Sequence, residues 1–404
     1  MVELKIVKSK KQQREFIKFA DNLYKENGSY VPYYHKFEKN LFYHKKNPNL
    51  LSNEIMGVLA YQEGRIVGRI LCISNRIEMS ENKIVRFSHF DCINDSEVSF
   101  ALLGAVCDWA KKNGAESVVG DLGFNDLMQC GIVLTGNTYG LSTFQQKFNF
   151  DYYIEHFKNF GFNIQKKFNE YQLILNENFD VEDADININR LLSLNNFRFV
   201  EGSKKFKISM YGRKIFDLLY ENSVSSYPSV VEDKVYNSYF KFIKTLFESE
   251  DLIIVINDSD EVVGVLLITR NTSLALQTTC GNVLVSKRMY TVGGQFKNEY
   301  DISLCAISKK SLNEVCQILS NKLAITFKLN NYYSVYTNVW INTEAKKQIF
   351  AKDFDVKLIR TRAICQKSLV DKPMVAKTAS KLVVKKRTSD LVGRARVGNR
   401  TVIK

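Results

Sequence analysis

The sequence has few of the features that mark linkers, membrane spans or exported proteins. Only four prolines occur among 404 residues, which argues against long proline-rich linkers. No apolar run approaches the length of a membrane span. The first residues, MVELKIVKSKKQQ, carry charges but no apolar signal core. We therefore expect a cytoplasmic protein that makes no contact with a membrane.

Cysteine pairs and metal-binding motifs are also missing. The eight cysteines stand singly, with no CxxC pair among them. This usage indicates reduced thiols in a cytosol-like compartment. His89 and Cys92 are spaced like metal ligands, but no second pair accompanies them. We expect no metal site.

The motifs of nucleophilic hydrolysis and of nucleotide hydrolysis are absent as well. The four histidines lie in unrelated sequence contexts and suggest no Ser/His/Asp set. The pair Gly293 and Gly294 lacks the Lys-Ser/Thr that follows in a Walker loop. Both classes of enzyme can be set aside.

Positive charge is concentrated at one end of the chain. The net charge is +14, and residues 371–404 hold ten Lys or Arg against two Asp, with no aromatic residue. Such a segment is typical of a flexible, solvated tail. It is also typical of an arm that neutralises the phosphates of nucleic acid or docks on an acidic protein. Without aromatic side chains it cannot stack on bases, so its contact with nucleic acid would be independent of base sequence.

One phrase occurs twice, about half a chain length apart. Residues 57–75 read GVLAYQEGRIVGRILCISN, and residues 252–271 read LIIVINDSDEVVGVLLITRN. Each predicts an apolar strand, a polar turn and a second strand with a glycine near its start, Gly68 or Gly264. A repeat at this distance predicts two copies of one domain fold.

The segments after each copy predict the same order of elements. A strand, a helix and a strand follow the first copy at 83–92, 96–113 and 117–121. Matching elements follow the second copy at 300–306, from Ser311, and at 333–340. The second of these helices opens with a capping box, Ser311 to Glu314.

A further helix and strand would then complete each half. They are expected at 151–160 and 162–176 in the first half, and at 344–352 and 356–366 in the second. The polar stretch 176–190 is the best candidate for a boundary. The fold class is therefore α/β, with a mixed sheet flanked by helices in each domain. We expect domains at 1–180 and 190–368, followed by a basic tail at 371–404.

This order resembles a tandem pair from the GNAT acetyltransferase superfamily. The strings FDCINDSEV (90–98), GDLGFNDLMQCGIVLTG (120–136) and NFDYYIEHFKNFGF (149–162) are similar to a bacterial subgroup of uncharacterised two-domain GNAT-like proteins. In the second half the resemblance depends on element order and on DEVVGVLLI (260–268). It implies that each sheet splays between its fourth and fifth strands, and that acetyl-CoA or another acyl-CoA enters the gap.

The resemblance places the CoA pyrophosphate on the loop that enters the helix after the fourth strand. The residues at that loop are Cys92, Ile93, Asn94, Asp95 and Ser96. Neither this loop nor its counterpart, residues 306–313, has the glycines that are usual there. Asp95 and Glu97 would repel a pyrophosphate, whereas Lys309 and Lys310 in the second loop would attract one.

The resemblance also implies roles for several side chains in acyl transfer to an amine. Asp91 would be the base that takes the amine proton, and Tyr153 the acid for the leaving thiolate, one turn from Phe157 at the typical position. Asn125 and Asp126 could contact the acceptor. Asp91 could also be an ordinary strand residue, Tyr153 a packing residue, and Asn125 and Asp126 a turn cap.

Two functions remain open at this point. One is an N-acyltransferase whose first half is active on a small-molecule or peptide amine and whose second half is degenerate. The other is a non-catalytic scaffold with the same fold, whose tail (371–404) binds nucleic acid or an acidic partner.

Overall fold

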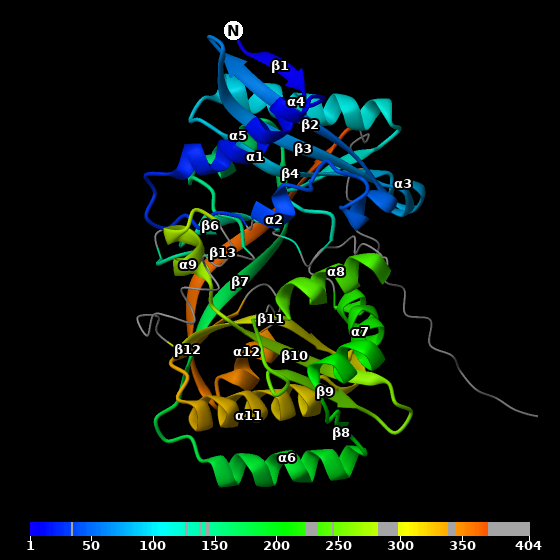
Figure 1. Ribbon diagram of the computed structural model, residues 1–404, viewed down its shortest axis with the longest axis vertical. Coiled ribbons are helices and arrows are strands. Elements are labelled where there is room, and N and C mark those ends of the chain that lie inside the picture. The colour runs from blue at the N-terminus through cyan, green and yellow to red at the C-terminus, as the bar shows by residue number, and fades with distance from the viewer. Residues whose placement is uncertain are drawn as a thin grey trace, which may run out of the picture. The chain divides into compact units, whose positions relative to one another are not determined.

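The computed structural model describes residues 1–33, 35–125, 128, 130–136, 139–142, 146–222, 233–244, 246–281, 298–337 and 344–370. Residues Met1–Leu369 form one compact unit (Figure 1). The basic tail at 371–404 lies outside the described residues. No helix in the described part of the chain is both long and apolar enough to cross a bilayer.

The first half follows the expected order, with short elements added. Its strands are β1 (Glu3–Ile6), β2 (Asn53–Gln62), β3 (Arg65–Asn75), β4 (Ile84–Cys92), β5 (Ser117–Gly120), β6 (Ile132–Thr135) and β7 (Asn163–Leu175). Its helices are α1 (Lys10–Tyr24), α2 (His35–Glu38), the 3-10 turn η1 (Pro48–Leu51), α3 (Arg76–Glu81), α4 (Ser96–Lys112) and α5 (Tyr152–Asn159).

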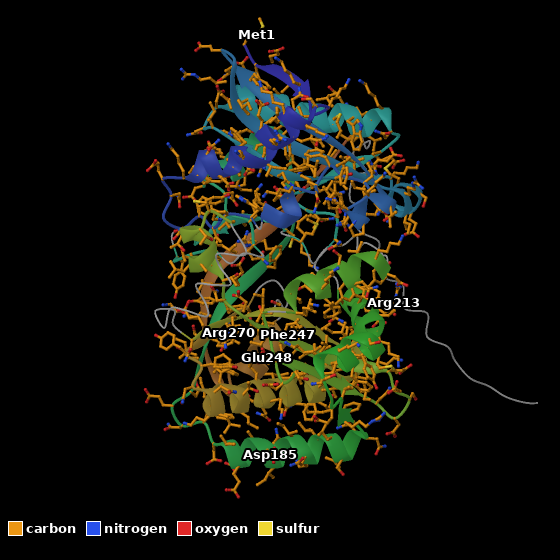
Figure 2. The ribbon with its side chains drawn as sticks, in the orientation of Figure 1. Met1, Asp185, Arg213, Phe247, Glu248 and Arg270 are labelled. Carbon is orange, nitrogen blue, oxygen red and sulfur yellow. The ribbon has the colours of Figure 1, made fainter. Side chains whose placement is uncertain are left out.

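The second half repeats the central part of that order. Its strands are β8 (Arg198–Phe199), β9 (Leu252–Ile256), β10 (Val262–Arg270), β11 (Glu299–Ile307), β12 (Ser334–Thr337) and β13 (Phe354–Ser368). Its helices are α6 (Val181–Asn195), α7 (Lys204–Glu221), α8 (Asp233–Ile243), α9 (Ser273–Thr278), the 3-10 turn η2 (Lys309–Ser311), α11 (Leu312–Asn330) and α12 (Glu344–Phe350). Arg213 on α7, labelled in Figure 2, donates to Asp233 at the start of α8 at 2.8 Å.

The strands form one mixed sheet. Its order is β1-β2-β3-β4-β5-β13-β7-β12-β11-β10-β9-β8, and β6 pairs with β13. The β4–β5 and β11–β12 pairs are parallel, and the other pairs in this order are antiparallel. The expected mixed α/β class is confirmed.

The pairing of the strands shows that the sequence repeat is a structural duplication. Gly68 on β3 lies opposite Cys92 on β4, and Gly264 on β10 lies opposite Ile307 on β11. A Cβ on Gly68 would meet Val98 and Leu102 of α4, and a Cβ on Gly264 would meet Val315 and Leu319 of α11. Glycine therefore occurs at the same place in both halves because a helix packs directly on the strand there.

This packing predicts the effect of adding one methyl group. Gly68→Ala and Gly264→Ala are each expected to lower the free energy of unfolding by about 1–3 kcal/mol, since the added carbon overpacks the contact with the helix. Gly104 on α4 is the control, because a Cβ added there would meet no atom within 4 Å. Gly104→Ala should instead raise stability by about 0.5–1 kcal/mol, because alanine is the better helix former. Urea denaturation would measure all three, and equal effects would contradict the prediction.

The two halves exchange their last long strands. We expected residues 162–176 to close the first half, but β7 pairs with β12 through Tyr171, Gln172 and Leu173. The strand that pairs with β5 is β13, through residues 365–368. β7 and β13 run side by side in antiparallel register (Figure 1). That expectation was therefore wrong, because the partner of β7 lies in the other half of the chain.

The register of β7 and β13 is symmetric about one central pair, Phe168 with Arg362. The ladder shifts register where β7 skips Gln165 and where β13 skips Ile359, each three residues before the central residue of its strand. Exchanging the two strands about this centre therefore restores the same positions of the register shifts. The duplication therefore extends to a local twofold relation between the strands that join the halves.

Two local expectations about the second half are corrected. The polar stretch at 176–190 contains the start of α6, whose N-cap Asp180 accepts from the N–H groups of Glu182 and Asp183. This helix packs on α11, so residues placed between the domains belong to the second half. Ser311 makes no side-chain capping bond, because the 3-10 turn η2 leads into α11 there. The boundaries 1–180 and 190–368 otherwise remain a prediction.

The parallel pair opens at the same register in both halves. β5 pairs with β4 from Ile84 to Phe87, while β4 continues to Cys92. β12 pairs with β11 from Glu299 to Ile302, while β11 continues to Ile307. The second part of each fourth strand is therefore left without its parallel neighbour. This opening determines where the candidate site lies.

Candidate functional site

Asp91 lies at the open end of β4, at the centre of a buried charge cluster. It is 1% exposed. Arg69 on β3 donates from Nε to Asp91 Oδ2 at 2.8 Å, and Tyr24 of α1 donates to Oδ1 at 2.8 Å. Although burial raises the pKa of Asp91, the charges of Lys147 and Arg69 lower it to about 2. Asp91 is therefore a fixed anion.

Lys147 joins this cluster from the segment before α5. Its Nζ donates to Asp121 Oδ2 at 2.5 Å and to the carbonyl of Phe90 at 2.6 Å, and it lies 3.7 Å from Asp91 Oδ1. Lys147 is 1% exposed. Its ammonium group balances two carboxylates and also satisfies a carbonyl of the open strand, which explains how a lysine can be buried there.

Tyrosine hydroxyls occupy the end of the open strand. The N–H of Cys92 donates to Tyr153 Oη at 2.8 Å. The carbonyl of Cys92 accepts from Tyr152 at 2.7 Å and from Tyr153 at 3.2 Å. Tyr153 also shares a hydrogen bond with Tyr24 at 2.8 Å, and burial raises its pKa well above the ordinary value. The strand edge that the resemblance assigns to acyl-CoA is therefore bonded to the protein itself.

The loop entering α4 is also unsuited to binding an anion. Asp95 is the N-cap of α4, and its side chain accepts from the N–H of Glu97 at 2.8 Å. Gln62 of β2 donates to its other oxygen at 2.9 Å, and this bond lowers the pKa of Asp95. A carboxylate thus sits where the resemblance would place a pyrophosphate, so Cys92, Ile93, Asn94, Asp95 and Ser96 do not fit acyl-CoA in the expected way.

The equivalent position in the second half is arranged differently. Ser311 makes no capping bond to α11, and Lys309 and Lys310 are exposed on the turn before it. The N–H of Ile307, which corresponds to that of Cys92, reaches Asn222 Oδ1 at the longer distance of 3.4 Å. The helix dipole and two ammonium groups favour an anion here.

Of the two residues predicted to contact the acceptor, the structure describes one. Asn125 is buried and donates to Asn49 Oδ1 at 3.0 Å, which ties it to the loop before β2. Asp126 lies outside the described residues. The described residues contain no group of His, Cys, Asp and Glu suited to a metal ion.

The structure adds five residues that the sequence did not single out, four in this cluster and Glu38 in a second polar chain beside it. They are Tyr24, Glu38, Arg69, Asp121 and Lys147. One signal was present, because Arg69 is a charge inside an otherwise apolar strand, where an ion-pair partner is required. The other four come from loops and helices far apart along the chain, and no local pattern connects them.

The buried histidine of β4 forms a second polar chain beside Asp91. His89 Nδ1 and Ser88 Oγ lie 2.8 Å apart, and His89 Nε2 lies 3.3 Å from Glu38 Oε1. His89 has a positive φ of 52°, and the pairing of β3 with β4 shifts register beside it. The bulge turns this imidazole toward α2 instead of the sheet neighbours.

No family model matches. A stretch of 130 residues is 28% identical to Protein YghO of Escherichia coli, and it makes up 32% of this chain and 33% of that protein. The match therefore spans about a third of that relative's length.

Solved structures similar to this chain include a tandem GNAT protein and a probable N-acyltransferase. A tandem GNAT protein from the clavulanic acid biosynthesis pathway matches with a TM-score of 0.49 and 9% identity, over 92% of this chain and all of that one. A probable N-acyltransferase from Enterococcus faecalis matches with a TM-score of 0.49 and 8% identity, over 91% of this chain and 73% of that one.

Proposed function

We propose that this chain is an acyltransferase that moves an acyl group from acetyl-CoA or another acyl-CoA to an amine, and that its second half holds the CoA. The observation that carries the proposal is the open end of β11, where α11 begins without a side-chain cap beside Lys309 and Lys310. The bound CoA would supply an activated thioester. The two lysines and the first N–H groups of α11 would hold its phosphates.

In this proposal the first half does not bind CoA and has a structural role. Its open strand is bonded to Lys147, Tyr152 and Tyr153, and its helix start is bonded to Asp95. A base must have a pKa near the working pH, and Asp91 at about 2 is far below it. We therefore assign Asp91 and Tyr153 to anchoring the end of β4, in place of the proton-transfer roles that the resemblance implied.

Acyl-CoA binding by charge-reversed variants tests the proposal. Lys309→Glu combined with Lys310→Glu should weaken acetyl-CoA binding by about tenfold or more, because two attractive charges become repulsive. Lys10→Glu combined with Lys11→Glu is the matched control, since these are also consecutive exposed lysines at the start of a helix. Titration calorimetry with acetyl-CoA and one longer acyl-CoA would give the affinities. Equal affinities for both double variants would reject the placement of CoA.

The alternative is a scaffold of the same fold without catalysis, and the closure of the first half favours it. Its expected partner is nucleic acid or an acidic protein on residues 371–404. Thermal shift with acyl-CoAs and binding of duplex DNA across a salt series separate the two functions. Salt-sensitive DNA binding with no response to any acyl-CoA would establish the scaffold.

A further inference from the structure

One edge of the sheet presents exposed apolar side chains. β1 is the first strand in the sheet order, and no described strand pairs with its outer side (Figure 1). On this strand Leu4 is 38% exposed and Ile6 is 48% exposed. The backbone of an edge strand is a template for pairing with a further strand. This edge is therefore a candidate surface for strand pairing.

The exposed side chains of β1 continue the core face of the sheet. Leu4 lies opposite Ala60, and Ile6 lies opposite Val58, so the members of each pair share one face. Val58 and Ala60 belong to the core that packs under α4, and Val2, just before β1, packs against that core. Val2, Leu4 and Ile6 thus form an apolar strip along the outermost strand, because alternate residues point to one face. A strand added to this edge would cover the strip.

The backbone groups of the same residues point out of the sheet. The N–H of Val7 donates to the carbonyl of Gly57 at 2.8 Å, next to the last pair of the β1–β2 ladder. In an antiparallel ladder, residues that bond to the neighbouring strand alternate with residues whose groups point away from it. The N–H and carbonyl of Lys5 therefore face β2, and those of Leu4 and Ile6 face the free edge. A strand added here would bond to Leu4 and Ile6.

The charges of β1 determine which strand would fit. Glu3 and Lys5 flank Leu4, and their charged groups lie 3.1 Å apart, on side chains that are 65% and 43% exposed. If a second β1 pairs antiparallel about Leu4, Glu3 of each copy lies opposite Lys5 of the other. A pairing centred on Glu3 or on Lys5 would instead place like charges opposite each other, which is destabilising. A pairing centred on Ile6 would place Lys5 opposite Val7 and form no ion pair.

We propose that the free edge of β1 binds β1 of a second copy of this chain, in an antiparallel pairing centred on Leu4. The two Leu4 residues would exchange backbone hydrogen bonds, and Val2 of each copy would lie opposite Ile6 of the other. The two pairs of Glu3 with Lys5 would fall at the positions without backbone hydrogen bonds, where opposite side chains are closest. The sheets of the two first halves would then be continuous across a twofold axis. This pairing depends neither on CoA binding nor on acyl transfer.

Sedimentation velocity of the full-length protein at several concentrations tests for the dimer. The wild type should form a reversible dimer that salt weakens, because its ion pairs are exposed. Glu3→Lys alone and Lys5→Glu alone should each weaken dimerisation by about tenfold or more, because each places like charges opposite each other at both pairs. Glu26→Lys is the matched control, since Glu26 forms an exposed ion pair with Lys25 just after α1, and it should leave the dimer unchanged. A wild type that stays monomeric at every concentration would overturn the proposal.

Mixing the two β1 variants tests the register. The Glu3→Lys protein carries two positive charges on β1, and the Lys5→Glu protein carries two negative charges. Antiparallel pairing about Leu4 brings these charges together, so an equimolar mixture should form a mixed dimer at least as tight as that of the wild type. Circular dichroism would show that each variant is folded. A dimer that neither single variant weakens, or a mixture that does not restore dimerisation, would show that the copies do not pair in this way.

Discussion

Replacing Arg69 with methionine is expected to lower the free energy of unfolding by about 3–5 kcal/mol, because it removes one of the two cations that compensate the buried carboxylate of Asp91. Arg69 is fully buried, and its Nε donates to Asp91 at 2.8 Å. Its Nη1 donates to the carbonyl of Phe16 at 2.6 Å, so the variant also loses a hydrogen bond between the sheet and α1. Methionine keeps much of the apolar volume of the side chain, so the decrease in stability would come mainly from the lost charge and its hydrogen bonds. Urea denaturation would measure it.

Arg65→Met is the matched control for this experiment. Arg65 opens the same strand and is exposed, so its replacement should change stability by no more than about 0.5 kcal/mol. A second variant separates charge from packing. Adding Asp91→Leu to Arg69→Met should recover a large part of the loss, because the carboxylate that has lost one of its two cations is removed. A loss below about 1 kcal/mol in the single variant would show that Asp91 is not held as a charge.

The ion pair of Arg69 and Asp91 also predicts how the stability difference between wild type and Arg69→Met depends on pH. The pKa of Asp91 is about 2 in the folded protein, below its ordinary value of 3.8. A group whose folded pKa is depressed stabilises the fold above its unfolded pKa. That contribution decreases as the pH falls from near 4 through about 2. The stability gap between wild type and Arg69→Met should therefore narrow in that interval.

The order of elements could be predicted because it depends on local patterns. The hairpins around Gly68 and Gly264 are predicted by the alternation of apolar and polar residues and by the turn residues between the strands. Each glycine is also set locally, because a helix packs on the strand at that position. The partner of β7 could not be predicted in this way. The alternation of apolar and polar residues in β7 would allow it to pair with strands of either half. Which strands it pairs with depends on β12 and β13, which lie far along the chain. The start of α6 was also missed, because its acidic first turn reads as a solvated boundary.

The candidate site was predictable only where the resemblance pointed to its residues. Asp91 and Tyr153 do meet at the end of β4, through Tyr24 and Cys92. Their roles could not be read from the sequence, because the pKa of Asp91 depends on Arg69 and Lys147 from other elements. The missing glycines of the loop were informative. They indicated a poor fit for CoA, and the Asp95 cap gives the physical reason.

Replacing Glu170 with glutamine should destabilise the protein by at least about 3–5 kcal/mol, because it removes the one carboxylate between two buried arginines. Glu170 on β7 accepts from Arg362 Nε and, at 3.3 Å, from Arg360 Nη1. All three side chains are at most 3% exposed. The two arginines also hold the loops of the first half, since Arg362 donates to the carbonyl of Lys147 at 2.6 Å and Arg360 to that of Leu141 at 2.9 Å.

The position of Glu170 makes this prediction more specific than a loss of stability. The residue lies beside the symmetric centre of β7 and β13, where the halves exchange strands. Weakening that centre should loosen both halves together, so amide hydrogen exchange should rise in β4 and in β11 alike. Glu177→Gln, exposed just beyond β7, is the control and should change neither stability nor exchange. Faster exchange confined to one half would mean that the halves fold independently, and that the exchanged strands join two separate domains.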